Sequence, residues 1–488
     1  SRRSGAMLLP LLFATFTMPP NPALTALRVL LANNSAQHSI KTGALTPASA
    51  FTGFHNHLAY YVTALYRLGA GADELSAAYA HASVGMLPPA PRRGLVNAST
   101  WEERVGSCGC GLVSGRTDLD YLDYYDFYKA SMSAHGVNAT LSAYWPRLAA
   151  GLGGDIFHAV IQLGYAFESG DLDEMTAQGL AWCSTAYAVL PGPTSTSPPP
   201  LRMTPAAALS ALQHDPYPFP HYAQQDDPHG PAGRCQTVRA NDPHGNVCWN
   251  DAVEDLVADH STALLRYELD WGWLASGFVG GGEEGEGETA EDDVALQQLC
   301  RAALLAFAAG GYDDFYLLHL VTGSRGVWAV ANMLGWWNTS LSVAQAATKR
   351  DMLTALWRAM LYAFVVKLRP DVTTPPALAP PWRPWSRLAA GARNFTETHL
   401  AKVRRENVLS MSAASPDSCY CYDFVLVLTT SACPIHALLS TSSFLLPSLL
   451  CQMVFTCRDF HERWGDDLYW QVADRVVALY ERGGQFKH

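Results

Sequence analysis

The spacing of apolar residues constrains this chain more than any other feature, because they recur every three and four positions along most of its length. This spacing places apolar side chains on one face of an α-helix. Clean alternation with a period of two is scarce, and strands and helices do not alternate as they would around a parallel sheet. We therefore predict an all-α fold, with helices at 46–68, 72–80, 121–135, 138–150, 157–168, 175–189, 253–274, 292–309, 315–334, 342–366 and 468–481.

The chain has 488 residues, of which 49 % are hydrophobic, so it can bury a sizeable core. We expect one large multi-helix domain over residues 25–488, preceded by a segment, 1–24, that reads as a targeting remnant. Two segments interrupt the helical pattern: 191–233 is dense in Pro, Ser and His, and 280–293 is rich in Gly and Glu. We interpret both as surface insertions.

The charge of the chain bears on its partners and location. Lys and Arg number 33 against 44 Asp and Glu, which gives a net charge of -11. This balance disfavours nucleic acid and an anionic membrane surface, and it favours an apolar aromatic small molecule. The apolar run 7–18 is too short to span a bilayer, and no acidic residue precedes Asp73. We expect a cytoplasmic protein, with an organelle reached through an N-terminal transit segment as the alternative.

Several chemistries lack their sequence signals. The glycines of 280–287 alternate with glutamates, and no predicted strand precedes them. A dinucleotide site needs glycines directly after a strand, so such a site is not indicated. The chain contains neither a G-x-S-x-G elbow nor an HExxH motif. Its eleven cysteines are irregularly spaced, which is not typical of a disulfide framework.

The remaining candidates for a functional site are histidines. Five histidines lie in apolar helical contexts, where an unpaired imidazole would be costly: His55, His57, His158, His319 and His399. Each alone is typical of a core histidine that makes one hydrogen bond. Together they fit the way in which helical bundles assemble metal sites from inward-facing side chains on several helices.

Helical spacing adds further residues to these histidines. His57 and Tyr61 are four residues apart and would share a helical face, as would His399 and Lys402, which are three apart. Asp314 and Thr322 flank His319, and they could orient the imidazole or a substrate. A solvated lysine remains the simple alternative for Lys402.

Four motifs in this chain resemble the questin oxidase-like family. They are F-H-N-H at 54–57 followed by Y-R-L-G-A at 66–70, G-G-D-x-F-H at 153–158, D-F-x-x-x-H-L-V-T at 314–322, and T-H-L-A-K at 398–402. The resemblance covers about residues 25–402, with a weaker part at 466–477, and segment 406–456 does not share it. The family reads His-His where this chain has Tyr60 and Tyr61.

The resemblance implies a function. Members of the family oxidise and open the rings of anthraquinone-like aromatic polyketides with molecular oxygen. Some are described as NADPH-dependent Baeyer-Villiger oxidases, and at least one as a nonheme iron dioxygenase whose iron is held by histidines and a carboxylated lysine. Because flavin and nucleotide signals are missing here, we favour Fe(II) with molecular oxygen.

By position, the resemblance implies His57, His158, His319 and His399 as metal ligands and Lys402 as the carboxylated lysine. His55 is either a neighbour of the metal or a competing ligand, and Tyr61 would replace a histidine, as a phenolate or at the expense of activity. Two alternatives stay open at this point. One is an NADPH-dependent oxidase without iron, and the other is a non-catalytic helical protein that binds a small molecule.

Overall fold

The computed structural model describes residues 21–40, 55–83, 86–106, 120–169, 172–192, 203–220, 252–253, 255–269, 271, 288–312, 314–336, 341–367, 369–373, 383–398 and 434–482. In this part of the chain every regular element is a helix, apart from one isolated bridge between Met203 and Trp271. The predicted all-α class is confirmed.

The first half of the chain contributes short helices. In chain order they are α1 (Pro22–Gln37), α2 (Leu58–Arg67), α3 (Ala72–Ala82), α4 (Tyr121–His135), α5 (Val137–Leu148), η1 (Ala149–Gly151), η2 (Gly154–Phe157), α6 (His158–Gly164), α7 (Ala166–Ser169), α8 (Leu172–Thr185) and α9 (Pro205–Gln213).

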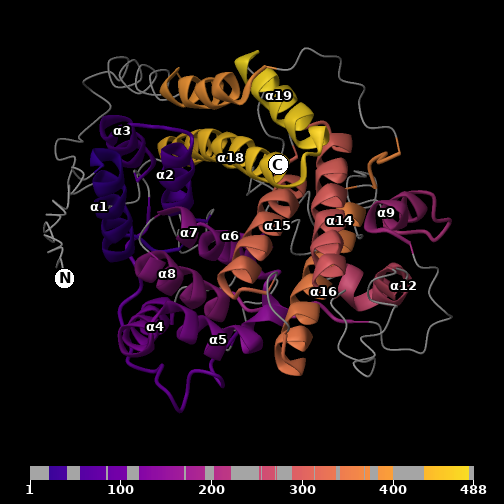
Figure 1. Ribbon diagram of the computed structural model, residues 1–488, viewed down its shortest axis with the longest axis horizontal. Coiled ribbons are helices and arrows are strands. Elements are labelled where there is room, and N and C mark those ends of the chain that lie inside the picture. Colours follow the sequence, from indigo (N-terminus) through magenta and orange to yellow (C-terminus); the bar gives the residue numbers. More distant parts are fainter. Residues whose placement is uncertain are drawn as a thin grey trace, which may run out of the picture.

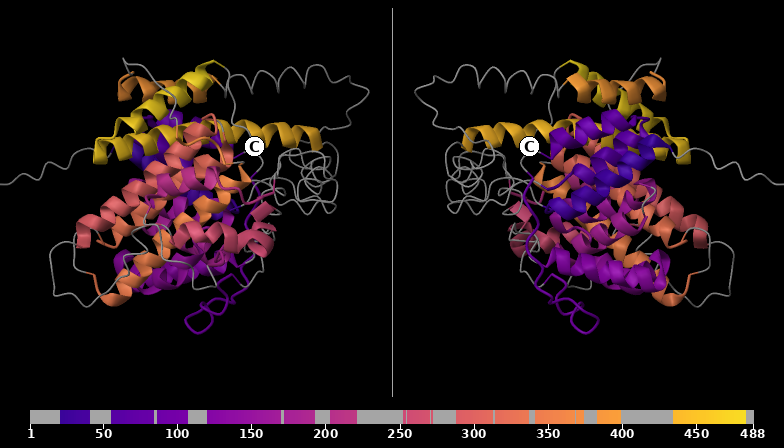
Figure 2. Two further views of the ribbon diagram at one scale, coloured as in Figure 1. Left: turned by 90° about the vertical axis from the view of Figure 1, so that its right-hand side faces the viewer. Right: turned by 90° about the vertical axis from the view of Figure 1, so that its left-hand side faces the viewer.

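The second half contributes short helices as well as the longest ones. They are the π-helix η3 (Leu256–His260), α12 (Ser261–Leu269), α14 (Glu288–Ala309), α15 (Phe315–Met333), α16 (Val343–Val366), α18 (Pro434–Trp464) and α19 (Asp467–Glu481), and residues 385–398 are also helical. Figure 1 shows α1 to α5 and α8 on one side of the molecule, with α14 and α16 on the other and α6 and α15 between them. Both side views in Figure 2 place α18 and α19 across one end of the remaining helices.

Helix α6 lies at the centre of this arrangement, and all seven of its residues are buried. It packs against α8 and α15, and glycines let the backbones approach closely. A β-carbon on Gly326 of α15 would lie 2.5 Å from the carbonyl oxygen of Val160, and one on Gly179 of α8 would lie 2.6 Å from the Cα of Leu163. Neither crossing has room for a larger residue, so α6 is fixed between its two neighbours.

The helix predicted from residue 157 is broken into α6 and α7. Before it, Asp155, Ile156 and Phe157 all have positive φ values, of 50°, 53° and 66°. Left-handed backbone is unfavourable for residues other than glycine, and most of all for a β-branched one. The chain therefore reaches α6 through a strained turn, and His158 is the first residue after it.

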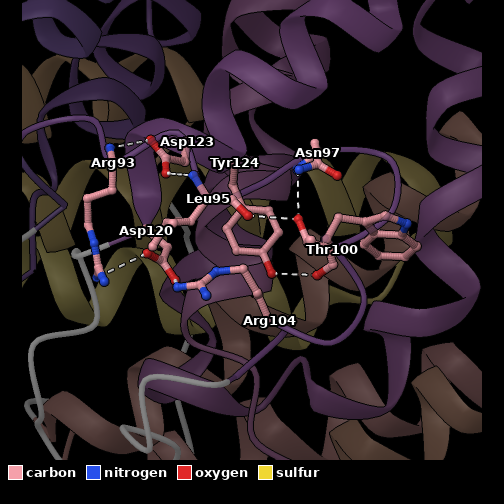
Figure 3. A network of polar contacts seen from close by, with 9 residues as sticks. Arg93, Leu95, Asn97, Thr100, Arg104, Asp120, Asp123 and Tyr124 are labelled. Atoms are coloured by element: carbon pink, nitrogen blue, oxygen red, sulfur yellow. Dashed lines mark hydrogen bonds and ion pairs between the residues drawn. The ribbon is translucent and has the colours of Figure 1, made fainter.

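A loop before α4 is fixed by polar contacts rather than by a helix (Figure 3). The carboxylate of Asp123 accepts hydrogen bonds from the backbone N–H groups of Arg93 and Leu95, each at 2.8 Å. Asp120, at the start of the same helix, pairs with Arg104 at 2.6 Å. These contacts hold residues 93–104 against α4, which itself packs on α8.

Two segments with weak sequence signals also pack against the core. Residues 203–220, within the interpreted insertion 191–233, include α9, whose Leu209 and Leu212 are buried. Helix α18 covers the second half of the atypical segment 406–456, and its Cys451 and Phe455 are buried in the core. It contacts α2 and α15. Among the described helices, none is both long and apolar enough to cross a membrane.

Buried charges tie α18 to the centre of the molecule. Arg325 of α15, with 1 % of its side chain exposed, pairs with Glu168 of α7 at 2.7 Å and with Asp459 of α18 at 3.1 Å. Its guanidinium also lies over the rings of Tyr165 and Phe455, 4.8 and 4.3 Å from their centroids. One side chain thus links three helices around α6.

Candidate metal centre

Three histidines from separate parts of the chain converge in the core. His57 immediately precedes α2, His158 begins α6, and His319 lies in the second turn of α15. The Nε2 atom of His158 is 2.9 Å from that of His57 and 3.1 Å from that of His319. Potential ligand atoms of all three lie within 4.8 Å of one another. Their exposed fractions are 5 %, 0 % and 1 %.

Backbone carbonyls fix the tautomers of two of these imidazoles. The Nδ1–H of His158 donates to the carbonyl oxygen of Asp155, and the Nδ1–H of His319 donates to that of Phe315 at 2.6 Å. A carbonyl oxygen only accepts, so each ring carries its proton on Nδ1 and presents a lone pair at Nε2. Two lone pairs therefore face each other at 3.1 Å.

Burial keeps the cluster neutral. The pKa of His57 lies well below its ordinary value because the ring is buried, and the neighbouring His319 and His55 lower it further. The pKa of His158 is lowered in the same way, first by burial and then by the surrounding histidines. A proton shared between the rings is therefore not favoured at neutral pH, and the facing lone pairs are left unscreened.

These features match the donor set of a metal ion. Neutral imidazoles whose second nitrogen donates to a carbonyl are the usual form of a histidine ligand. Two histidine nitrogens at about 2.1 Å from one ion and at right angles to each other lie about 3 Å apart. The observed separations of 2.9 and 3.1 Å agree with this value. The three residues fit a borderline divalent cation such as Fe(II).

Asn56 positions His57. Its side-chain N–H groups donate to the side-chain oxygen of Asn34 at 3.0 Å and to the carbonyl of Ser39 at 2.8 Å. Its own oxygen accepts from the backbone N–H of Leu58 at 2.9 Å, at the start of α2. Residues 55–57 are thus held outside the helix, where the sequence had predicted a continuous one.

Asp155 positions the opposite side of the cluster. Its carbonyl holds His158, and its carboxylate accepts a hydrogen bond from the indole N–H of Trp182 at 3.0 Å. The Trp182 ring is stacked on His158 with centroids 6.0 Å apart. The same carboxylate lies 3.4 Å from the Nε2 atom of His55.

His55 lies behind the three converging nitrogens rather than among them. Its ring centroid is 3.9 Å from that of His158, and its Nε2 faces Asp155. The described group of converging ligand atoms comprises His57, His158 and His319, and His55 faces the Asp155 carboxylate.

The ring that packs on His57 belongs to Tyr60, at a centroid distance of 4.9 Å. Tyr61 is also buried, and its backbone N–H donates to the carbonyl of His57 at 2.9 Å. Burial, and then the nearby Cys451, raise the pKa of its hydroxyl well above the ordinary value.

Asp314 and Thr322, which flank His319, form hydrogen bonds with backbone groups of α15. Asp314 caps α15, accepting hydrogen bonds from the backbone N–H groups of Tyr316 and Leu317, and it pairs with Lys367 at 2.9 Å. Thr322 is 2 % exposed and donates to the carbonyl of Leu318 at 3.3 Å. The ring of His319 itself donates to the carbonyl of Phe315. His399 and Lys402 lie outside the described residues.

Sequence reasoning missed two positioning residues, Asn56 and Asp155. Asn56 stands between two histidines of the F-H-N-H motif, and that position was the available signal. Asp155 belongs to the G-G-D-x-F-H motif, but its contacts depend on a left-handed turn at residues 155–157, which helical periodicity does not predict.

Taken together, the fold and site define an all-helical protein with a buried three-histidine centre. The profile of the questin oxidase-like family matches residues 54–406, which is more than half of the chain and includes all three histidines. The chain therefore belongs to the questin oxidase-like family, and membership indicates an oxidoreductase and suggests an oxidase of aromatic polyketides. A search of curated proteins finds no match.

Proposed function

We propose that this protein oxidises or cleaves the ring of an aromatic polyketide with molecular oxygen, at a nonheme iron held by His57, His158 and His319. The observation that carries the proposal is the convergence of three buried imidazole Nε2 atoms, two of which are fixed as lone-pair donors. By family resemblance, His399 and a carboxylated Lys402 would complete the ligand set.

A redox-active metal supplies the electrons that let molecular oxygen react with a closed-shell aromatic ring. The protein orients the imidazole rings and surrounds them with apolar side chains that exclude water. Carbonyls of Asp155 and Phe315 hold two imidazoles with their Nε2 atoms inward. Aromatic rings surround the cluster: Phe315 lies 4.3 Å from His319 and Tyr60 lies 4.9 Å from His57, centroid to centroid. An apolar aromatic substrate suits such walls.

Oxygen uptake with a hydroxyanthraquinone tests this function. Protein reconstituted with Fe(II) under anaerobic conditions should consume oxygen and substrate together when oxygen is admitted, without NADPH. His319→Ala should reduce the rate at least about 100-fold. Loss of a residue that only contacts a metal ligand costs up to about 100-fold, and this variant removes a proposed ligand itself. His38→Ala is the matched control, since His38 is a partly buried histidine that lies next to Tyr79 and outside the cluster.

Two results would contradict the proposal. Uptake that requires NADPH and is indifferent to iron would favour the iron-free Baeyer-Villiger type of oxidase. Binding of the ring compound with no uptake under either condition would favour a non-catalytic binding protein.

A further inference from the structure

Two buried tyrosines beside the histidines have hydroxyl groups that no described residue satisfies. Tyr60 of α2 and Tyr165, between α6 and α7, are 0 % and 1 % exposed. Their rings are stacked with centroids 6.0 Å apart. Within the described part of the chain, neither hydroxyl has a hydrogen-bond partner.

The pair extends from the histidine cluster toward the buried arginine. Tyr60 packs on His57, and Tyr165 lies under the Arg325 guanidinium, 4.8 Å from ring centroid to charge. Phe455 of α18 closes the far side, 5.8 Å from Tyr165. The two stacked phenols therefore lie between the ring of His57 and the guanidinium of Arg325.

Both side chains can donate hydrogen bonds, because each phenol carries an O–H group. Both can also stack on a flat ring.

A buried hydroxyl without a partner is unfavourable, and native proteins rarely leave one unless a ligand, ion or water completes it. Here two such groups lie together, next to the candidate reaction site. A bound molecule with two oxygen acceptors on a flat ring would satisfy both and would fit between aromatic side chains.

We propose that the hydroxyls of Tyr60 and Tyr165 donate hydrogen bonds to carbonyl or hydroxyl oxygens of the substrate, so that the site selects oxygenated aromatic rings over plain ones. This inference rests on the proposed function only in taking the histidine cluster as the place where the ring reacts. It names the two residues that determine specificity and the ligand chemistry that they recognise.

Binding of two probes with similar rings tests the inference. Dissociation constants for 1,8-dihydroxyanthraquinone and for anthracene are measured anaerobically, by quenching of tryptophan fluorescence, for wild type, Tyr60→Phe and Tyr165→Phe. Each variant should bind the anthraquinone about 10-fold more weakly, the loss expected for one hydrogen bond to a buried acceptor. Affinity for anthracene should stay within about 2-fold, because the rings that it contacts are kept.

Tyr469→Phe is the matched control. Tyr469 of α19 is a fully buried phenol whose hydroxyl also has no partner among the described residues, but its ring contacts are with Phe460 and Trp464. Its variant should bind both probes like the wild type.

Two results would overturn the inference. Unchanged anthraquinone affinity in both variants would mean that the phenols bond to water only. An equal loss for anthracene would mean that the rings, not the hydroxyls, had been disturbed. Iron content of the same samples separates this inference from the proposed function: tyrosine-dependent binding by a protein that takes up no iron would uphold the former and refute the latter.

Discussion

The Nε2 atom of His158 lies within hydrogen-bond distance of two other imidazoles. For the His158–His319 pair this closeness is unfavourable, because both rings hold their proton on Nδ1 and their Nε2 lone pairs face each other. A cation between them or an added proton would relieve it, and burial disfavours the added proton. A metal ion bound to the Nε2 atom of His158 would remove this repulsion.

The buried histidines should make the metal-free protein sensitive to acid. In the unfolded chain a histidine titrates near its ordinary pKa, whereas burial lowers the pKa of His57 and His158 in the folded protein. As the pH falls below about 6.5, the unfolded state binds more protons, so the free energy of unfolding should drop by up to about 1.4 kcal/mol per pH unit for each histidine. Urea unfolding of chelator-treated protein at several pH values measures this slope.

The variant His158→Gln removes one of the two titrating groups and should show a shallower pH dependence than the wild type. Identical slopes in the two proteins would contradict the assignment of a depressed pKa to His158.

Asn56 should matter both for stability and for the metal. Asn56→Ala removes three hydrogen bonds and leaves the buried carbonyl of Ser39 and side chain of Asn34 short of a donor. We expect a loss of about 2–3 kcal/mol in the free energy of unfolding and metal affinity about 10-fold to 100-fold weaker. Chemical denaturation and metal titration measure the two effects.

Asn97→Ala is the control, because Asn97 is exposed and its side-chain oxygen accepts hydrogen bonds from Ser99, two residues along the same turn. Its metal affinity should match that of the wild type. Equal metal affinity in Asn56→Ala would show that His57 does not depend on its neighbour.

How far the sequence predicted the site can be judged residue by residue. His57, His158 and His319 were named from their apolar contexts and from family motifs, and the structure brings these three together. Asn56 and Asp155 were missed because their roles depend on partners distant in the sequence or on local strain. Tyr61 and His57 are joined by the backbone hydrogen bond that a spacing of four predicts, while the ring that packs on His57 is that of Tyr60.

At the scale of elements, the three-histidine cluster depends on how closely α6 and α15 approach. A β-carbon on Gly326 would overlap the Val160 carbonyl, and one on Gly164 would lie 2.7 Å from the Cα of Gly326. Gly326→Ala should therefore push the helices apart, cost about 1–3 kcal/mol in unfolding free energy, and move His158 away from His319.

Thermal unfolding and metal titration of Gly326→Ala test this point. Gly71→Ala is the control, because its added β-carbon would meet only the carboxylate of Glu74, at an ordinary 3.6 Å. Unchanged metal binding in Gly326→Ala would mean that the helix crossing does not set the distance between the histidines.

Periodicity predicted the regular helices well and their interruptions poorly. The range 121–135 was predicted as the structure shows it in α4, and α16 begins one residue after its predicted start, where Ser342 caps it. Helix α1 was not predicted, since the buried polar residues Asn34 and Ser35 interrupt its apolar face. The break before His158 was also missed, because periodicity carries no signal for a left-handed turn.

At the scale of the whole molecule, the class of fold follows from helical spacing, but the arrangement of the helices does not. His158 and His319 are 161 residues apart in the chain, yet their Nε2 atoms are 3.1 Å apart. Their meeting depends on glycine contacts and on the buried Arg325 network, neither of which leaves a pattern in one sequence. Family motifs, rather than periodicity, linked the three histidines beforehand.

Iron content of anaerobically purified protein, by elemental analysis, tests the central claim most directly. The wild type should hold about one iron per chain, as expected for a single centre, and His38→Ala should retain it. His158→Ala and His319→Ala should each lose most of the iron while remaining helical by circular dichroism. Iron retained in both cluster variants, or no iron taken up by the wild type, would contradict the assignment of this metal centre.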